Sequence, residues 1–149
     1  MPVRYDDIQI GDLMPVYTSL PITRSHLVRY AGASGDFNPI HYDETFARGI
    51  GLDNVIVHGM FIMGLAGDAI TAWIGGRGLR KFKVKFLAMT EPVDLNDLEN
   101  TKDRATISVT GKVVLKYEEN GEKRIRCDIV AEDGQGSRKL SGFFIAALD

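Results

Sequence analysis

Residues 60–73 read Met-Phe-Ile-Met-Gly-Leu-Ala-Gly-Asp-Ala-Ile-Thr-Ala-Trp, and they are apolar on nearly every face of a helix. A helix that is hydrophobic all round is normally buried. Gly64 and Gly67 each cost about 1 kcal/mol of helix propensity relative to alanine. That cost is understandable if another backbone packs hard against the helix. The stretch therefore predicts one buried helix, ended by Gly75, as the centre of the fold.

The chain after this helix has the alternation of an antiparallel sheet. In residues 80–86, phenylalanine and valine occupy one face and lysine the other. Asn120-Gly121 predicts a hairpin between two long strands. The first of these strands is expected to bend or bulge at Gly111, and residues 91–103 before it are expected to be irregular. The expected buried face of that strand comprises Ala105, Ile107, Val109, Val113, Leu115 and Tyr117.

The chain before the buried helix predicts a strand and two helices. The strand is expected over residues 14–20. Thr23 is expected to cap a helix that stops by Gly35, with His26 as a solvated surface residue. Residues 44–48 are expected to form a short helix. Together these elements predict an α+β fold in a single domain, residues 1–149, with an antiparallel sheet wrapped around one buried helix.

Composition restricts the class of protein. Eighteen basic and twenty acidic residues give a net charge of −2, which argues against a general nucleic-acid binder. The single cysteine, Cys127, excludes an internal disulfide framework and a cysteine-cluster metal site. The first ten residues do not resemble a signal peptide. The longest apolar run contains Asp68 and is too short for a membrane span, so we expect a cytoplasmic protein.

Residues 30–43, Tyr-Ala-Gly-Ala-Ser-Gly-Asp-Phe-Asn-Pro-Ile-His-Tyr-Asp, carry the strongest chemical signal. Asp36 precedes His41 by five residues. Gly35 permits a sharp turn before the pair, and Pro39 stiffens the loop. A carboxylate with a pKa of about 3.9 and an imidazole with a pKa of about 6.5 can hold one water and move protons at neutral pH. The alternative is a pair of turns with an ordinary loop histidine.

This string resembles the hydratase motif of the MaoC-like dehydratases, which include (R)-specific enoyl-CoA hydratases and (3R)-hydroxyacyl-ACP dehydratases. Gly51-Leu52-Asp53 and His58-Gly59-Met60 follow in that family's order and spacing. Within the family, the chain is most similar to the catalytic B-type subunits of mycobacterial heterodimeric dehydratases. The resemblance implies a hotdog fold and a lyase of fatty-acid metabolism. Its reaction would be the reversible hydration of trans-2-enoyl thioesters to (3R)-hydroxyacyl thioesters.

The resemblance also implies roles for individual residues. Asp36 and His41 match the catalytic pair, and we expect His41 to handle the α-proton and Asp36 the water, although this division stays open. Gly59 and Met60, at the start of the buried helix, are expected to stabilise the thioester oxygen through unpaired N–H groups. For Gly59 the alternative is tight packing. Asn38 is expected to hold the loop or a hydrogen bond to the Asp36–His41 pair, and it is a further candidate for substrate binding.

Other polar residues receive weaker interpretations. Asp68 is interpreted as a core or interface carboxylate, and His58 as a structural residue that caps the helix or bonds across an interface. Asp36, His41, Asp43 and His58 have no established ligand spacing, so no metal is expected. No cofactor is expected beyond the pantetheine of the substrate's CoA or acyl carrier protein. Its phosphates have candidate contacts in Arg77, Arg80, Lys81 and Lys83, for which a solvated strand face is the alternative.

Two other function classes stay open: a hotdog acyl-thioesterase, and a non-catalytic acyl-binding partner subunit. A small sheet leaves at least one edge unpaired, which predicts a dimer. The partner is expected to be a second copy or a related hotdog subunit, with an acyl carrier protein as a further candidate. The acyl chain length, the choice of carrier and the direction of the reaction stay open.

Overall fold

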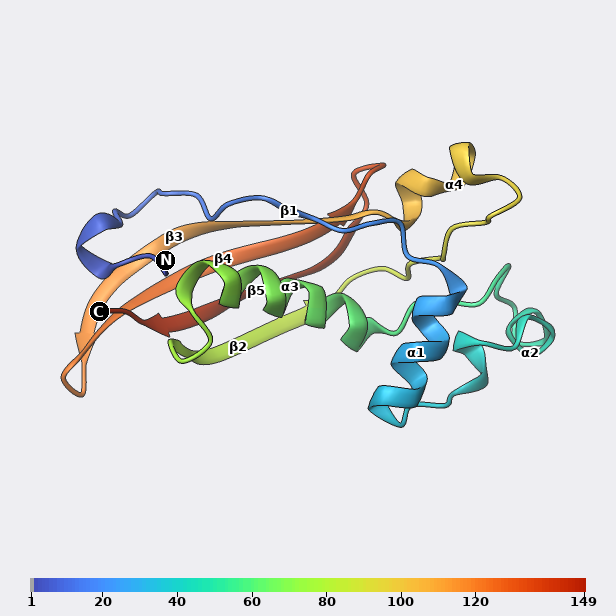
Figure 1. The fold of residues 1–149 in the computed structure, drawn as a ribbon, viewed down its shortest axis with the longest axis horizontal. Coiled ribbons are helices and arrows are strands. Elements are labelled where there is room, and N and C mark those ends of the chain that lie inside the picture. Colours follow the sequence, from blue (N-terminus) through green and yellow to red (C-terminus); the bar gives the residue numbers. More distant parts are fainter. Residues whose placement is uncertain (1) are drawn as a thin grey trace.

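The computed structural model describes residues 2–149, which form an antiparallel sheet that curves along one long helix (Figure 1). Within these residues the sheet has five strands in the order β1-β3-β4-β5-β2. The strands are β1 (Tyr17–Thr18), β2 (Leu79–Phe86), β3 (Ile107–Glu119), β4 (Glu122–Asp133) and β5 (Arg138–Ala147). The helix α3 (Gly59–Ile74) packs against one face of the sheet. This architecture confirms the predicted α+β arrangement.

The helix α3 is buried on one side only. Its buried residues are Ile62, Ala66, Ala69, Ile70 and Ile74, whereas Gly64 and Asp68 are exposed. The prediction of burial on nearly every face is wrong, because a single-layer sheet covers one side of the helix. A Cβ atom at Gly64 would meet nothing within 4 Å. Gly64 therefore does not mark a close backbone contact, and Asp68 is not a core carboxylate.

Strand β3 changes face part-way along its length. The register with β4 shifts between Val113 and Leu115, and Leu115 is consequently 49% exposed while Val113 is buried. One extra residue in a strand reverses the faces of all the residues that follow. The bulge was expected at Gly111, where instead a Cβ would lie 3.0 Å from Sγ of Cys127. The prediction that Leu115 lies on the buried face of the strand is therefore wrong.

Two predicted segments differ from the structure. The segment expected to be irregular contains a helix, α4 (Leu98–Ala105). It buries only Thr101 and Ala105, and its polar composition gave no apolar run that would have indicated a helix. Ala105 therefore ends a helix and does not begin a strand. At the other end of the chain, β1 has two residues, Tyr17–Thr18, rather than seven, since Pro15 has no N–H to donate to a ladder.

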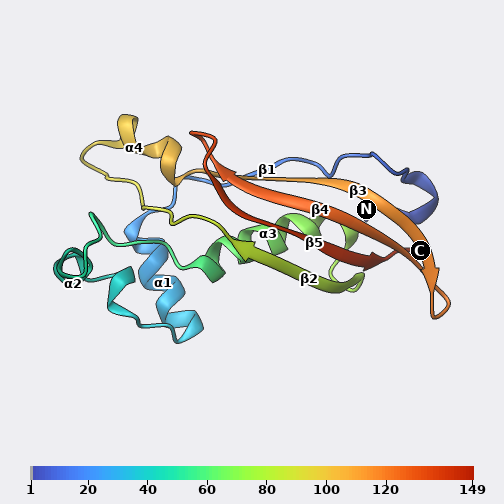
Figure 2. The ribbon, with the colours of Figure 1, turned by 180° about the vertical axis from the view of Figure 1, so that it is seen from behind.

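The helices around residue 36 follow the predictions. Thr23 caps α1 (Arg24–Ser34), and Gly35 ends it with φ of 76°. His26 completes a capping box with Thr23, so it is more than the solvated surface residue predicted. The short helix α2 spans Glu44–Gly49. From behind, Figure 2 shows α1, α2 and α4 gathered at the end of the sheet where α3 begins.

The two chain termini lie together at the opposite end, beside the 3-10 helix η1 (Tyr5–Asp7) and the hairpin between β3 and β4 (Figure 1). None of the helices formed by residues 2–149 combines the length and apolarity that crossing a bilayer requires.

Candidate active site

The loop that carries Asp36 is shaped by its own polar side chains. The N–H of Asp36 donates to Oγ of Ser34 at 3.2 Å, and the N–H of Asn38 donates to Oδ1 of Asp36 at 3.2 Å. The N–H of Ile40 then donates to Oδ1 of Asn38 at 3.2 Å, which starts the 3-10 helix η2 (Pro39–His41). These short-range bonds fix the carboxylate, and they use the side-chain oxygen of Asn38 to hold the loop.

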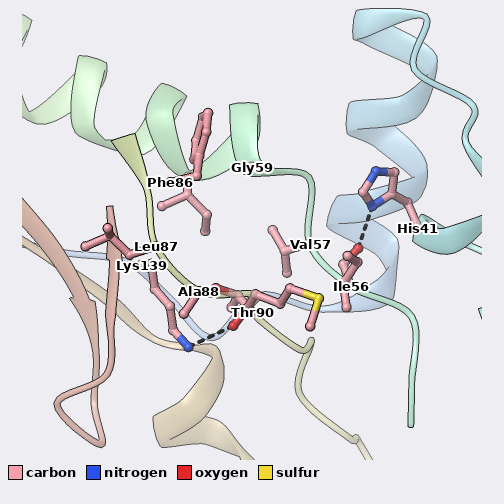
Figure 3. A pocket seen from close by; sticks show the side chains of 11 residues that line it. His41, Ile56, Val57, Gly59, Phe86, Leu87, Ala88, Thr90 and Lys139 are labelled. Atoms are coloured by element: carbon pink, nitrogen blue, oxygen red, sulfur yellow. Dashed lines mark hydrogen bonds between the residues drawn. The ribbon is translucent and has the colours of Figure 1, made fainter. Parts of the chain in front are cut away.

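One ring nitrogen of His41, Nε2, faces Asp36, and the other, Nδ1, faces the backbone of Ile56. The His41 side chain is buried, and Nδ1 lies 2.7 Å from the carbonyl oxygen of Ile56 (Figure 3). Because a carbonyl only accepts, Nδ1 carries the proton and Nε2 is left as the free base. Nε2 lies 3.8 Å from Oδ2 of Asp36. This distance is too long for a direct hydrogen bond but allows one water or hydroxyl to contact both groups.

His58 completes the cluster, although its side chain makes no cap bond to α3. It is 1% exposed, and its ring stacks on that of His41 with centroids 3.7 Å apart and planes at 20°. Nε2 lies 3.1 Å from the carbonyl oxygen of Asp36, to which it donates. Burial lowers the pKa of His58 below 6.5, partly opposed by this hydrogen bond. The ring is therefore neutral at neutral pH.

The first turn of α3 offers free donors beside this cluster. Its first backbone bonds come from the N–H groups of Phe61 and Ile62 to His58, so within residues 2–149 those of Gly59 and Met60 have no acceptor. Both residues are exposed. Unpaired donors at a helix start stabilise negative charge. A Cβ at Gly59 would lie 3.2 Å from the ring of Phe86, so packing also favours glycine here.

A cavity of about 310 Å³ extends from His41 and Gly59 to Lys139 (Figure 3). Its walls are mainly apolar and include Ile56, Val57, Ile62, Phe86, Leu87 and Met89. An apolar cavity that opens on a base and on free N–H donors suits an acyl chain whose carbonyl end reacts.

The far end of the cavity is held by a buried ion pair that sequence reasoning missed. Nζ of Lys139 lies 2.9 Å from Oδ2 of Asp133 and donates to the carbonyl oxygen of Met89 at 2.9 Å. The N–H groups of Gln135 and Ser137 satisfy the other carboxylate oxygen. The pair therefore fixes the cavity wall to the sheet. A lysine at the start of the otherwise apolar β5, after an Asp-Gly turn, was the available signal.

The basic residues expected to meet phosphates lie elsewhere. Arg77 and Arg80 follow the C-terminal end of α3, whose 16 residues extend about 24 Å from Gly59. The guanidinium of Arg80 is bound to Glu122 at 2.8 Å. Lys81 and Lys83 are exposed on β2. The structure therefore brings neither arginine close to the Asp36–His41 pair.

Asp36, His41 and His58 each have one potential metal-ligand atom within 4.8 Å of the others. Reasoning from sequence spacing did not anticipate this grouping. The two imidazoles, however, lie in nearly parallel planes 3.7 Å apart. Their in-plane lone pairs do not converge on one point, as the ligands of a tetrahedral ion must. The stacked geometry therefore disfavours one metal ion shared by these three residues.

Comparison with known sequences gives one matching family model, described as MaoC like domain, over residues 9–126. 3-Hydroxyacyl-thioester dehydratase Y of Mycobacterium tuberculosis is 31% identical over 102 residues, which are 68% of this chain and 34% of that protein. The fatty acid synthase beta subunit hexB of Dothistroma septosporum is 31% identical over 126 residues, 74% of this chain and 6% of that protein. The chain thus spans well under half the length of these curated relatives.

Two solved structures have a similar fold. The unliganded R-hydratase PhaJ1 of Pseudomonas aeruginosa superposes with a TM-score of 0.79 at 23% identity, covering 99% of this chain and 86% of that chain. A chain of the ChsH1-ChsH2 complex of Mycobacterium tuberculosis matches with a TM-score of 0.74 at 17% identity. The match covers 95% of this chain and 98% of that chain. Both likenesses show that residues 2–149 form a hotdog-like domain, with an antiparallel sheet packed against a long helix.

Proposed function

The chain belongs to the MaoC-like dehydratase family, and from this we propose that it is a hydro-lyase that reversibly converts trans-2-enoyl thioesters into (3R)-hydroxyacyl thioesters. One observation carries the proposal: the free Nε2 of His41 lies 3.8 Å from Oδ2 of Asp36, beside the unpaired N–H groups that start α3. The proposed substrates are fatty-acyl thioesters of CoA or acyl carrier protein. The (3R) configuration rests on the likeness to R-specific hydratases.

The proposed hydration begins with the thioester oxygen bound to the N–H groups of Gly59 and Met60, which stabilise the enolate charge. Asp36 accepts a proton from water as the water oxygen bonds to the β-carbon. For hydration, His41 must first have bound a proton on its free Nε2, and it gives this proton to the α-carbon. Asp36 then returns its proton to His41 across the gap between them, which resets the pair. Dehydration follows the same steps in reverse.

The decisive experiment is a hydration assay with trans-2-enoyl-CoA. We expect loss of the enoyl thioester absorbance, a (3R) product on chiral analysis, and no release of free thiol. Asp36→Asn and His41→Ala should each lower kcat at least about a hundredfold in folded protein. Asp7→Asn, which changes an exposed carboxylate of η1, is the matched control and should keep wild-type activity. Near-normal activity in either Asp36→Asn or His41→Ala, or a (3S) product, would refute the assignment.

The proposed active form is a dimer. The outer edge of β2 pairs with no strand among residues 2–149, and Met89, in the wall of the cavity, is 60% exposed. A second subunit beside β2 would cover this edge and close the cavity. The proposed partner is a second copy or a related hotdog subunit, as in mycobacterial heterodimers. This chain would then supply the Asp36–His41 pair, and an acyl carrier protein is a further proposed partner.

Lys81 and Lys83 are the proposed contacts for the phosphates of the carrier. Both are exposed on the edge strand β2, on the face opposite to Phe86, whose ring lies beside Gly59. Arg77 and Arg80 are weaker candidates, since they lie at the far end of α3 and Arg80 is already paired.

A further inference from the structure

We propose that His58 is a positioning residue, whose Nε2–H holds the backbone carbonyl of Asp36 and so keeps the Asp36 carboxylate in register with His41. This inference rests on the proposed hydration reaction and assigns a role that the sequence interpretation of His58 did not include. His58 touches neither substrate nor reacting atoms in this scheme and acts through Asp36.

The position of Asp36 depends on few contacts. Its side chain is 51% exposed. The backbone bond to Ser34 and the carboxylate bond from Asn38 are both local, spanning two residues each. Within residues 2–149, the hydrogen bond from His58, 22 residues away, is the only hydrogen bond that ties Asp36 to another part of the fold. Without it, Asp36 is held only by hydrogen bonds within its own loop.

The surroundings of His58 favour an imidazole over a purely apolar ring. Asp36, His41 and Tyr30 face it, the ring of Tyr30 at a centroid distance of 4.8 Å. When Nε2–H donates, neutral His58 leaves Nδ1 as a lone-pair acceptor, and this buried atom has no partner among residues 2–149. A buried acceptor without a donor is destabilising. A residue present only for packing would avoid that cost by being Phe.

The charge of His58 also affects how readily the neighbouring His41 carries a proton. Burial keeps the ring neutral, and the hydrogen bond to Asp36 fixes its tautomer. Protonated His41 is required in the hydration scheme, and a second cation 3.7 Å away would oppose it. A neutral aromatic face is instead attractive to a cation. Stacking on His41 thus favours a neutral His58. Only the hydrogen bond to Asp36 distinguishes histidine from another flat ring.

Two substitutions separate these contacts. His58→Phe keeps a flat ring against His41 and removes the donor, whereas His58→Gln removes the ring and keeps an N–H donor for the Asp36 carbonyl. Misplacing a catalytic group by about 1 Å can cost a hundredfold in rate. We therefore expect His58→Phe to lower kcat about tenfold or more with little change in KM. We expect His58→Gln to restore kcat to within about threefold of wild type.

Hydrogen exchange of the peptide that covers residues 30–43 gives a readout independent of turnover. Exchange should be faster in His58→Phe and close to wild type in His58→Gln. A folded His58→Phe with normal kcat and exchange overturns the proposal, as does an equal loss in both variants. If His58→Phe does not fold, the His58→Gln variant decides by itself: a loss of kcat in folded His58→Gln overturns the proposal. If the wild-type chain hydrates no enoyl thioester, the proposed function fails and the exchange result still decides whether His58 holds the loop.

Discussion

His58 links protonation of one side chain to the stability of the fold. Its pKa in the folded protein is lowered from 6.5, with burial as the main cause. Below pH 6.5 the unfolded chain therefore binds a proton that the folded chain does not yet bind. The free energy of unfolding is highest, with respect to this group, above that pH. It falls as the pH drops from 6.5 through the lowered pKa.

We expect the wild-type protein to lose more stability than His58→Gln when the pH falls from about 7.5 to about 5.5, because glutamine does not titrate in this range. Urea unfolding at the two pH values measures the difference through the transition midpoints. Equal midpoint shifts in the two proteins would show that His58 titrates alike in the folded and unfolded states.

At the residue scale, local signals were readable from the sequence and long-range contacts were not. Thr23, Gly35 and Asn38 act on their immediate neighbours, so their roles follow from turn and cap chemistry. Cys127 lies in the apolar pattern of its strand, and burial raises the pKa of its thiol to about 12. The contact of His58 with Asp36 and the bond from Lys139 to Met89 join segments 22 and 50 residues apart. Only packing brings those segments together.

At the scale of elements, strand β2 carries the lysine face that is proposed to bind the phosphates of the carrier. Neutralising Lys81 and Lys83 to glutamine should raise KM for enoyl-CoA several-fold at low salt and less at high salt, since salt screens exposed charges. The value of kcat should not change, because neither residue is near the reacting atoms. Lys112→Gln, an exposed lysine on β3, is the matched control. A KM that stays constant would identify the lysine face as an ordinary solvated surface.

Element types were predicted better than their details. The capped helix α1, the buried side of α3 and the hairpin at Asn120-Gly121 follow from caps, apolar runs and turn residues. The bulge between Val113 and Leu115 has no glycine to mark it, and alternation read through it therefore placed Leu115 on the wrong face. The helix α4 buries only two small residues, Thr101 and Ala105, so its sequence lacks the large apolar side chains that mark a packed helix.

At the scale of the whole molecule, the open edge of β2 and the uncovered cavity wall predict a dimer. Light scattering on the purified chain should give the mass of two copies, and assays with crotonyl-CoA and trans-2-dodecenoyl-CoA should then show which acyl chains are accepted. A fully active monomer would contradict the proposed assembly. A stable dimer that turns over only the short substrate would indicate that a related hotdog subunit supplies the missing tunnel wall.

Hydrogen bonds from the two proposed catalytic residues, Asp36 and His41, lead to one short segment of the chain. Asp36 is bound through its carbonyl to His58, and His41 is bound through Nδ1 to Ile56, while Gly59 continues the same segment into α3. The proposed acid, base and oxyanion donors are thus all attached to the segment formed by residues 56–60. We expect a shift of this segment to displace the three groups together rather than one relative to another. Ile56, Val57 and Gly59 also line the cavity. Substitutions meant to change the accepted acyl length are therefore expected to leave the proposed chemistry intact only where they fall outside this segment, for example at Leu87 or Met89.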